Sequence, residues 1–183
     1  MLVEKLKAPD LWAKAAIVLV LAGAAVGAAL PRTWRVEQRV TIAAPPERIH
    51  PLVEDLKRWQ EWTVWTKARD PALRNIYEGE ASGVGARWTW MGPKMGQGTL
   101  EIVEASTETG VTLAQAIESP NPNSRATIRY VRTAEGTEVI WVDEGTLPVL
   151  VGGLFRNVVE ERLGAALAES LAKLKSVAEA PAP

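Results

Sequence analysis

Residues 154–178 read LFRNVVEERLGAALAESLAKLKSVA and form a long helical pattern near the end of the chain. Their apolar residues recur at intervals of three and four, which is the spacing of one face of a helix. Glu169 and Lys173 lie outside that face and form a favourable pair one turn apart. A helix of about 25 residues is roughly twice the usual length, so we expect it to lie across a whole curved sheet. The apolar positions are Phe155, Val158, Val159, Leu163, Ala166, Leu167, Leu171, Leu174 and Val177.

The chain before this helix alternates between apolar and polar residues, as strands do. Residues 32–42 (RTWRVEQRVTI) predict a first strand, and a helix over residues 47–56 follows Pro45-Pro46. Gly, Pro and Asn residues mark short turns between the later runs, so neighbouring strands should be antiparallel. Six further strands are predicted over residues 73–81, 86–91, 98–106, 110–118, 125–133 and 137–146. We therefore predict an α+β fold, in which a seven-stranded antiparallel sheet wraps around the long C-terminal helix.

Residues 11–30 contain one charge, Lys14, in twenty positions. A helix of this length covers about 30 Å, the thickness of the hydrocarbon core of a bilayer. Trp12 and Trp34 bracket the run as interfacial aromatic residues do. We therefore predict a single-pass transmembrane helix that attaches the folded domain to a membrane.

Two other interpretations of this N-terminal run remain open. Lys5 and Lys7 followed by Ala22-Gly23-Ala24 also fit a cleaved signal peptide, and a soluble helix is the third interpretation. Basic residues are balanced on the two sides of the run, so they do not set its orientation. Because a short N-terminal tail usually stays in the cytoplasm, we expect the folded domain to lie outside the cytoplasm.

The composition excludes several classes of protein. With 21 Lys+Arg and 22 Asp+Glu, the formal net charge is −1, so the chain lacks the basic excess of nucleic-acid-binding proteins and no nucleic-acid partner is expected. It has no cysteine and a single histidine, His50, which argues against thiolate or histidine-rich metal sites. We expect neither a metal nor a cofactor.

Eight tryptophans stand against two tyrosines and one phenylalanine. Trp59, Trp62 and Trp65 are three residues apart, so in a helical turn they would form a continuous aromatic wall. Tryptophan combines a large apolar area with a polar N–H. The wall could fill the core or line a pocket, and the spacing does not decide between the two.

No catalytic arrangement is convincing. A lone histidine gives no Ser–His–Asp constellation, and we expect His50 to be exposed or to pack against other residues. Asp55 fits a cap or an ion pair better than a catalytic group. Tyr130 and Gln115 could point into a cavity and orient the polar end of a ligand. The polar residues that we considered for catalysis are His50, Asp55, Gln115, Arg129, Tyr130, Asp143 and Glu144.

A set of short motifs runs through the chain in the order of these predicted elements. They are Ile42-Ala43-Ala44-Pro45, Asp55-Leu56, Trp59-x-x-Trp62-x-x-Trp65, Tyr77-x-Gly79, Ala81-x-Gly83-Val84-Gly85-Ala86, Trp88-x-Trp90, Gly96-x-Gly98 and Thr137-Glu138-Val139-Ile140-Trp141. With them the chain resembles the START-like superfamily, in particular its polyketide cyclase/dehydrase and lipid-transport (SRPBCC) branch. The resemblance covers about residues 34–178 and implies a helix-grip (START/Bet v 1-like) fold. We therefore expect an anchor or uncleaved signal segment over 1–31, a START-like ligand-binding domain over 32–179 and a disordered tail over 180–183.

The resemblance also implies a hydrophobic cavity between the sheet and the long helix. We expect it to bind a lipid-, quinone- or polyketide-like small molecule, although the motifs carry no diagnostic catalytic signature. Two alternatives stay open: an enzyme of cyclase or dehydratase type that uses the same cavity, and a protein-interaction domain whose cavity has collapsed. The residues expected to line the cavity are Trp62, Trp65, Trp88, Trp90, Leu100, Ile102, Leu113, Gln115, Ile128, Tyr130, Trp141, Phe155, Val159 and Leu163.

Overall fold

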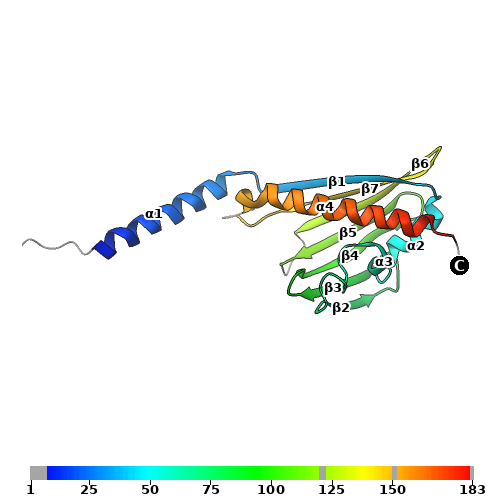
Figure 1. Cartoon of the computed structure of the whole chain (residues 1–183), viewed down its shortest axis with the longest axis horizontal. Coiled ribbons are helices and arrows are strands. Elements are labelled where there is room, and N and C mark those ends of the chain that lie inside the picture. The colour runs from blue at the N-terminus through cyan, green and yellow to red at the C-terminus, as the bar shows by residue number, and fades with distance from the viewer. Residues whose placement is uncertain (1–7, 120–122, 150–151, 182–183) are drawn as a thin grey trace, which may run out of the picture.

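The computed structural model describes residues 8–119, 123–149 and 152–181 of the 183-residue chain. The predicted helix-grip fold, with seven antiparallel strands and a long C-terminal helix, is confirmed (Figure 1). Lys5, Lys7, most of the turn at residues 120–123 and the last two residues of the predicted tail lie outside the described residues. The elements are α1 (Ala8–Ala29), β1 (Thr33–Ile42), α2 (Pro46–Glu54), α3 (Trp59–Trp62), β2 (Arg74–Gly79), β3 (Ala86–Gly92), β4 (Gly96–Ser106), β5 (Gly110–Ile117), β6 (Ser124–Thr133), β7 (Gly136–Thr146) and α4 (Gly152–Glu179).

Element boundaries differ from the predicted ones by one or two residues, with local causes. The second helix ends at Glu54 rather than at residue 56, because Asp55 takes an extended backbone with φ −94° and ψ 103°. The second strand ends at Gly79 rather than at residue 81, because Gly79 takes a positive φ of 74°. Only glycine adopts that conformation without strain. The other strands begin and end within two residues of the predicted positions.

The sheet order is β1-β7-β6-β5-β4-β3-β2, and every neighbouring pair is antiparallel. In Figure 1 the sheet curves away from β1, and α4 runs across its concave side along β1. Both α2 and α3 contact α4, and the Ser170 hydroxyl of α4 accepts a hydrogen bond of 3.1 Å from the Val64 amide after α3. The C-terminal half of α4 is therefore held between the sheet and these two short helices.

Tryptophans fix the short helices to this core. The last carbonyls of a helix have no partner within it, and here indole N–H groups supply one. Trp59 Nε1 donates to the Val53 carbonyl at 2.8 Å, and Trp62 Nε1 donates to the Leu52 carbonyl at 2.9 Å. Both rings pack against Trp141, each with a centroid separation of 5.6 Å. These two tryptophans thus join α2 and α3 to strand β7 of the sheet.

The helix α1 leaves the domain at the end where α4 begins (Figure 1). Residues Trp12–Ala29 have a mean hydropathy of 1.9, and only 6 % of this stretch is buried. Its length and composition are those of a membrane-spanning helix, and also those of a signal sequence. It touches the domain where Gly153 of α4 lies against Gly27 and Leu30.

Candidate ligand-binding cavity

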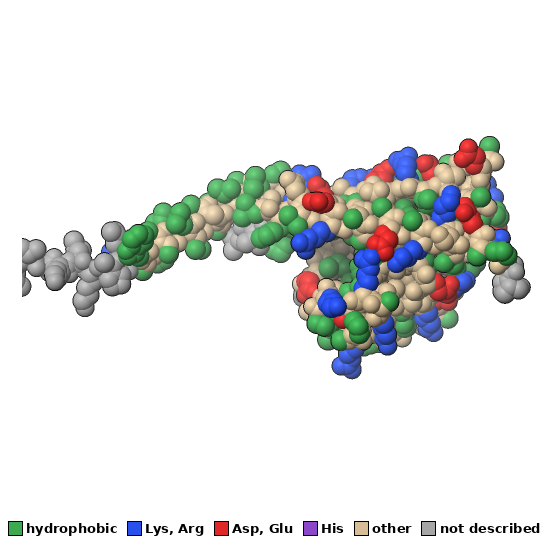
Figure 2. All heavy atoms as spheres, viewed as in Figure 1, with side chains coloured by type: hydrophobic (Ala, Val, Ile, Leu, Met, Phe, Trp, Pro, Cys, Tyr) green, Lys and Arg blue, Asp and Glu red, His purple; other side chains and the backbone are tan. Residues whose placement is uncertain are grey.

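A cavity of about 940 Å³ lies between the N-terminal half of α4 and the concave face of the sheet. Figure 2 shows the hollow beneath α4, between this helix and the strands β2 to β4. The space is therefore open rather than collapsed. The predicted residues that line it are Trp65, Trp88, Trp90, Leu100, Gln115, Trp141, Phe155, Val159 and Leu163.

The cavity lies beneath the half of α4 that is less buried. Leu167, Leu171 and Leu174 are at most 1 % exposed in the C-terminal half of α4. In the first two turns, Leu154 and Phe155 are 50 % and 55 % exposed. The helix is thus buried toward its C-terminus, whereas its first half contacts β1, where Glu160 accepts a hydrogen bond from the Arg35 amide, and leaves the neighbouring part of the concave face open as the cavity.

Five residues predicted to line the cavity do not border it. Trp62, Ile102, Leu113, Ile128 and Tyr130 are at most 6 % exposed and belong to the packed core. They lie on the expected concave face, but at the end where α4, α2 and α3 fill the space. The apolar alternation shows which face a residue occupies, and it carries no information about the point at which the helix separates from the sheet.

Trp88 and Trp90 form the floor of the cavity on β3. Their ring centroids are 5.1 Å apart, and Tyr77 of β2 stacks on Trp88 at an interplanar angle of 16°. Both N–H groups are satisfied: Trp88 Nε1 donates to Asn75 Oδ1 at 3.1 Å, and Trp90 Nε1 donates to the Met95 carbonyl at 3.3 Å. Because their polar atoms are occupied, these two residues offer mainly apolar ring surface to a ligand.

Gln115 and Asp143 are buried polar groups in this largely apolar lining, with exposed fractions of 7 % and 4 %. The strand register brings them together: Gln115 pairs with Ser124 of β6, and Ser124 pairs with Gly145 of β7. Asp143 lies two residues before Gly145 and opposite Ala126. Because the residues between them are small, the two longer side chains can meet across β6.

The hydrogen bonding of this pair is incomplete. Ser124 Oγ donates to Gln115 Oε1 at 3.0 Å, so the amide group of Gln115 is the donor that it turns toward Asp143. Burial raises the pKa of Asp143 to about 7, against the lowering effects of the Gln115 side chain and the Glu144 backbone. Among the described residues, Asp143 Oδ1 and Trp141 Nε1 have no hydrogen-bond partner. A buried polar atom without a partner is costly, so this wall of the cavity has unused hydrogen-bonding capacity.

The remaining candidates for catalysis lie elsewhere. His50 is buried at the far end, with Nδ1 3.4 Å from the Tyr130 hydroxyl and Nε2 3.2 Å from Glu54 Oε2. Burial and the charge of Glu54 raise the pKa of Tyr130. Asp55 Oδ1 accepts a hydrogen bond from the Lys57 amide at 2.9 Å, which is a turn contact. Arg129 and Glu144 are exposed, and Glu144 pairs with Arg35.

Sequence reasoning missed several lining residues. Asp143 was considered for chemistry but not for the lining, although it lies two residues after Trp141 and so on the same strand face. Trp34 alternates with Val36 in β1 and could have been found in the same way. Met95 lies between β3 and β4, and Leu147 lies between β7 and α4; alternation gives no signal in either connection. The other lining residues that were not predicted are Trp59, Ile117, Glu118, Ser119, Asn123, Ser124, Thr146, Pro148, Val158, Arg162 and Ala166.

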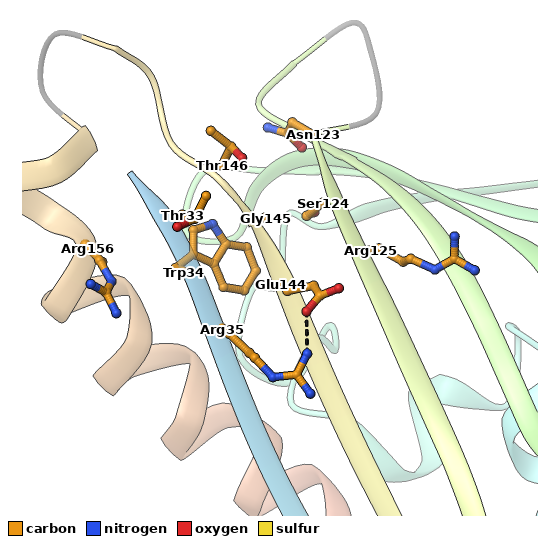
Figure 3. A pocket seen from close by; sticks show the side chains of 10 residues that line it. All are labelled: Thr33, Trp34, Arg35, Asn123, Ser124, Arg125, Glu144, Gly145, Thr146 and Arg156. Carbon is orange, nitrogen blue, oxygen red and sulfur yellow. Dashed lines mark hydrogen bonds and ion pairs between the residues drawn. The ribbon is translucent and has the colours of Figure 1, made fainter. Parts of the chain in front are cut away.

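A second, more polar groove of about 550 Å³ lies beside the ends of β1, β6 and β7 (Figure 3). It shares Trp34, Asn123, Ser124 and Thr146 with the cavity. Its arginines have acidic partners, because Arg35 pairs with Glu144 and Arg156 with Glu160. These pairs neutralise much of the positive charge of the groove, and we assign it no ligand.

The curved antiparallel sheet, the long helix that covers it and the open, mostly apolar cavity together define a helix-grip domain. The chain belongs to the family described as "Polyketide cyclase / dehydrase and lipid transport", whose profile matches residues 33–179. A comparison with curated proteins found no match.

Solved structures show the same fold at low sequence identity. Protein SA2116 from Staphylococcus aureus aligns with a TM-score of 0.62 at 12 % identity, over 80 % of this chain and 94 % of that one. The Aha1 dimer from Colwellia psychrerythraea gives 0.58 at 17 % identity, over 79 % and 96 %. Protein CV1439 from Chromobacterium violaceum gives 0.56 at 16 % identity, over 82 % and 100 %. At these identities the likeness is one of fold.

Proposed function

We propose that this protein binds a hydrophobic small molecule in the cavity beneath α4, while α1 tethers it to a membrane. The observation that carries the proposal is the cavity of about 940 Å³ with a lining of indole and aliphatic groups. Ligand pockets have volumes of roughly 300–1,000 Å³ and a mostly apolar lining with a few polar groups. A lipid-, quinone- or polyketide-like molecule would fit a pocket of this kind. The description of the family to which the chain belongs also names polyketides and lipids.

Affinity would come from apolar surface removed from water, at about 25 cal/mol per Å². Gln115 and Asp143 would orient the ligand, because they are buried and offer hydrogen bonds beside the tryptophan rings of the lining. A hydroxyl at the polar end of the ligand suits them best: it can donate to ionised Asp143 or accept from protonated Asp143. We therefore expect a largely apolar molecule with one hydroxyl-like end.

The test compares two tryptophan substitutions on α4. Ala166 lines the cavity, whereas Ala168, two residues further on, is exposed. Ala166→Trp should place an indole ring in the cavity where the ligand would lie, and Ala168→Trp should leave the cavity unchanged. The probe is 1-anilinonaphthalene-8-sulfonate, and bound molecules are identified by solvent extraction and mass spectrometry of the full chain. We expect a co-purified apolar molecule and strong probe binding, both lost in Ala166→Trp alone. Wild-type protein that carries no co-purified molecule and does not bind the probe would refute the proposal.

A second candidate function is acid–base catalysis on the enclosed molecule, of cyclase or dehydratase type. One observation favours it: Asp143 lines the cavity, and burial raises its pKa to about 7, which suits proton transfer near neutral pH. Incubating the extracted molecule with wild type and with Asp143→Asn separates the two functions. A dehydratase would lower the mass of the molecule by one water and a cyclase would change its chromatographic retention and fragment spectrum, in wild type and not in the variant. A binding protein would return the molecule unchanged from both.

The tether and its orientation have their own test. The intact mass of the purified protein distinguishes an anchor over residues 1–31 from a cleaved signal peptide. Because the chain has no cysteine, Ser176→Cys on exposed α4 surface gives a single labelling site. We expect an impermeant maleimide to label it in intact cells, as a domain outside the cytoplasm requires. Labelling only after lysis would place the domain in the cytoplasm.

A further inference from the structure

The end of the cavity that opens to the surface is the end at which α1 leaves the domain. Leu147 lines the cavity at this end and is bound to the residue that follows α1 and Pro31. Arg32 Nη1 donates to the Leu147 carbonyl at 3.0 Å, and the Leu147 amide donates to the Arg32 carbonyl at 3.0 Å. The start of α4 is joined to the same place, because a Cβ added to Gly153 would lie 2.4 Å from Leu30 Cβ. The exit of α1 and the mouth of the cavity thus lie at one corner of the domain.

Exposed apolar side chains gather at this corner. We call Leu30, Leu154, Phe155 and Val158 the apolar collar; their exposed fractions are 39 %, 50 %, 55 % and 44 %. Phe155 and Val158 also line the cavity. The last three lie on the first two turns of α4, and Leu30 follows α1 directly. Clustered exposed apolar residues mark a surface that another apolar phase covers.

The length of the connection brings the bilayer to this corner. Only residues 30–32 separate α1 from β1, and three residues span at most about 10 Å. If α1 crosses a membrane, the surface of that membrane lies within about this distance of Arg32, and so of the collar. The short connection after α1 therefore places a bilayer, and no other apolar phase, next to the collar.

We propose that the apolar collar rests in the lipid interface and that the cavity mouth faces the bilayer. Ligands then exchange between the membrane and the cavity without crossing water. This inference depends on the proposed membrane tether and goes beyond it, because a tethered domain could equally hold its cavity away from the lipid. Aromatic and aliphatic side chains next to arginines are typical of surfaces that lie in the interface; Arg32, Arg156 and Arg162 flank the collar.

Spin labels measure the position of the collar directly, because every cysteine introduced into this chain is the only one. The full chain is reconstituted in vesicles of phosphatidylcholine and phosphatidylglycerol, and each label is tested for collision with oxygen and with a water-soluble nickel chelate. Phe155→Cys and Val158→Cys report on the collar, and both positions are partly exposed. Val20→Cys reports on α1. Ser176→Cys, exposed near the other end of α4, is the matched control.

We expect the labels at 20, 155 and 158 to collide mainly with oxygen and the label at 176 mainly with nickel. Oxygen contact at 20 with nickel contact at 155 and 158 would overturn the inference and leave the tether intact. Nickel contact at 20, 155 and 158 would refute the tether and the inference together. Dipolar broadening between labels at 155, without oxygen contact, would show that a second copy covers the collar and would also overturn the inference.

Discussion

The indole ring of Trp90 lies directly over the backbone of Gly98, its partner on the neighbouring strand. A Cβ at Gly98 would be only 2.4 Å from Trp90 Cζ2. We expect Gly98→Ala to displace the ring from the cavity floor and to lower the free energy of unfolding by about 1–3 kcal/mol, as overpacked sites do. Urea unfolding of the full chain measures this effect.

Gly164 on α4 is the matched control for this substitution. Its added Cβ would lie 3.5 Å from Gln38 Nε2 and 3.6 Å from Val36 Cγ1, which are ordinary contacts. Because alanine is favoured over glycine inside a helix, Gly164→Ala should stabilise the protein by about 0.5–1 kcal/mol. Equal effects of the two substitutions would contradict the contact between Trp90 and Gly98.

Asp143 should make stability fall as pH rises. Its folded pKa of about 7 lies above the unfolded value of about 4, so the folded state holds the proton more tightly. The resulting penalty is absent below pH 4, grows as pH rises toward 7 and is complete above it. A difference of about three units corresponds to at most about 4 kcal/mol. Asp143→Asn should therefore stabilise the protein at pH 8 and do so much less at pH 5. Parallel unfolding profiles of the two proteins across this range would show that Asp143 does not titrate there.

Trp62 should be more important for stability than Trp65, three residues away. Trp62 is fully buried and donates to the Leu52 carbonyl, whereas Trp65 is partly exposed at the cavity. Trp62→Phe leaves a buried carbonyl without its donor and should cost about 1–3 kcal/mol. Trp65→Phe should cost less than half as much, measured by thermal unfolding. A larger effect of Trp65→Phe would contradict the assignment of Trp62 to the core.

Asp70 should hold the loop between β3 and β4 in place. It is 1 % exposed, and its Oδ2 accepts hydrogen bonds from the Lys94 and Met95 amides at 2.9 and 3.2 Å. Met95 lines the cavity, so the loop forms part of the wall. Asp70→Ala should speed hydrogen exchange at these two amides by at least about tenfold, the equivalent of 1.4 kcal/mol. Asp70→Asn keeps one acceptor oxygen and should have a smaller effect; unchanged exchange in Asp70→Ala would exclude the role.

Strand faces could be predicted from the sequence, and the position of the cavity along them could not. Alternation correctly assigned Trp88, Trp90 and Leu100 to the concave face, because a two-residue period leaves one choice per strand. The same rule placed Ile128 and Tyr130 on that face, yet they are covered by helices from distant parts of the sequence. That outcome depends on how α2, α3 and α4 pack, which no local pattern encodes.

The three-residue spacing of tryptophans was a weaker guide. It predicted one continuous wall, but α3 ends at Trp62 and Thr63 takes an extended backbone with φ −83° and ψ 170°. Trp65 therefore leaves the helical turn. Trp59 borders both the core and the cavity, Trp62 only the core, and Trp65 the cavity. A single residue with a non-helical backbone was enough to divide the set.

Because α4 is buried most deeply in its C-terminal half, any tilt of the helix would pivot near Leu171. Phe155 lies sixteen residues away, or about 24 Å along the axis. A tilt of about 5° about that point would move Phe155 by about 2 Å, together with Leu30 and the end of α1 that touch the start of α4, while the buried leucines barely shift. The domain would thus accommodate ligands of different width by tilting one helix, without repacking its interior.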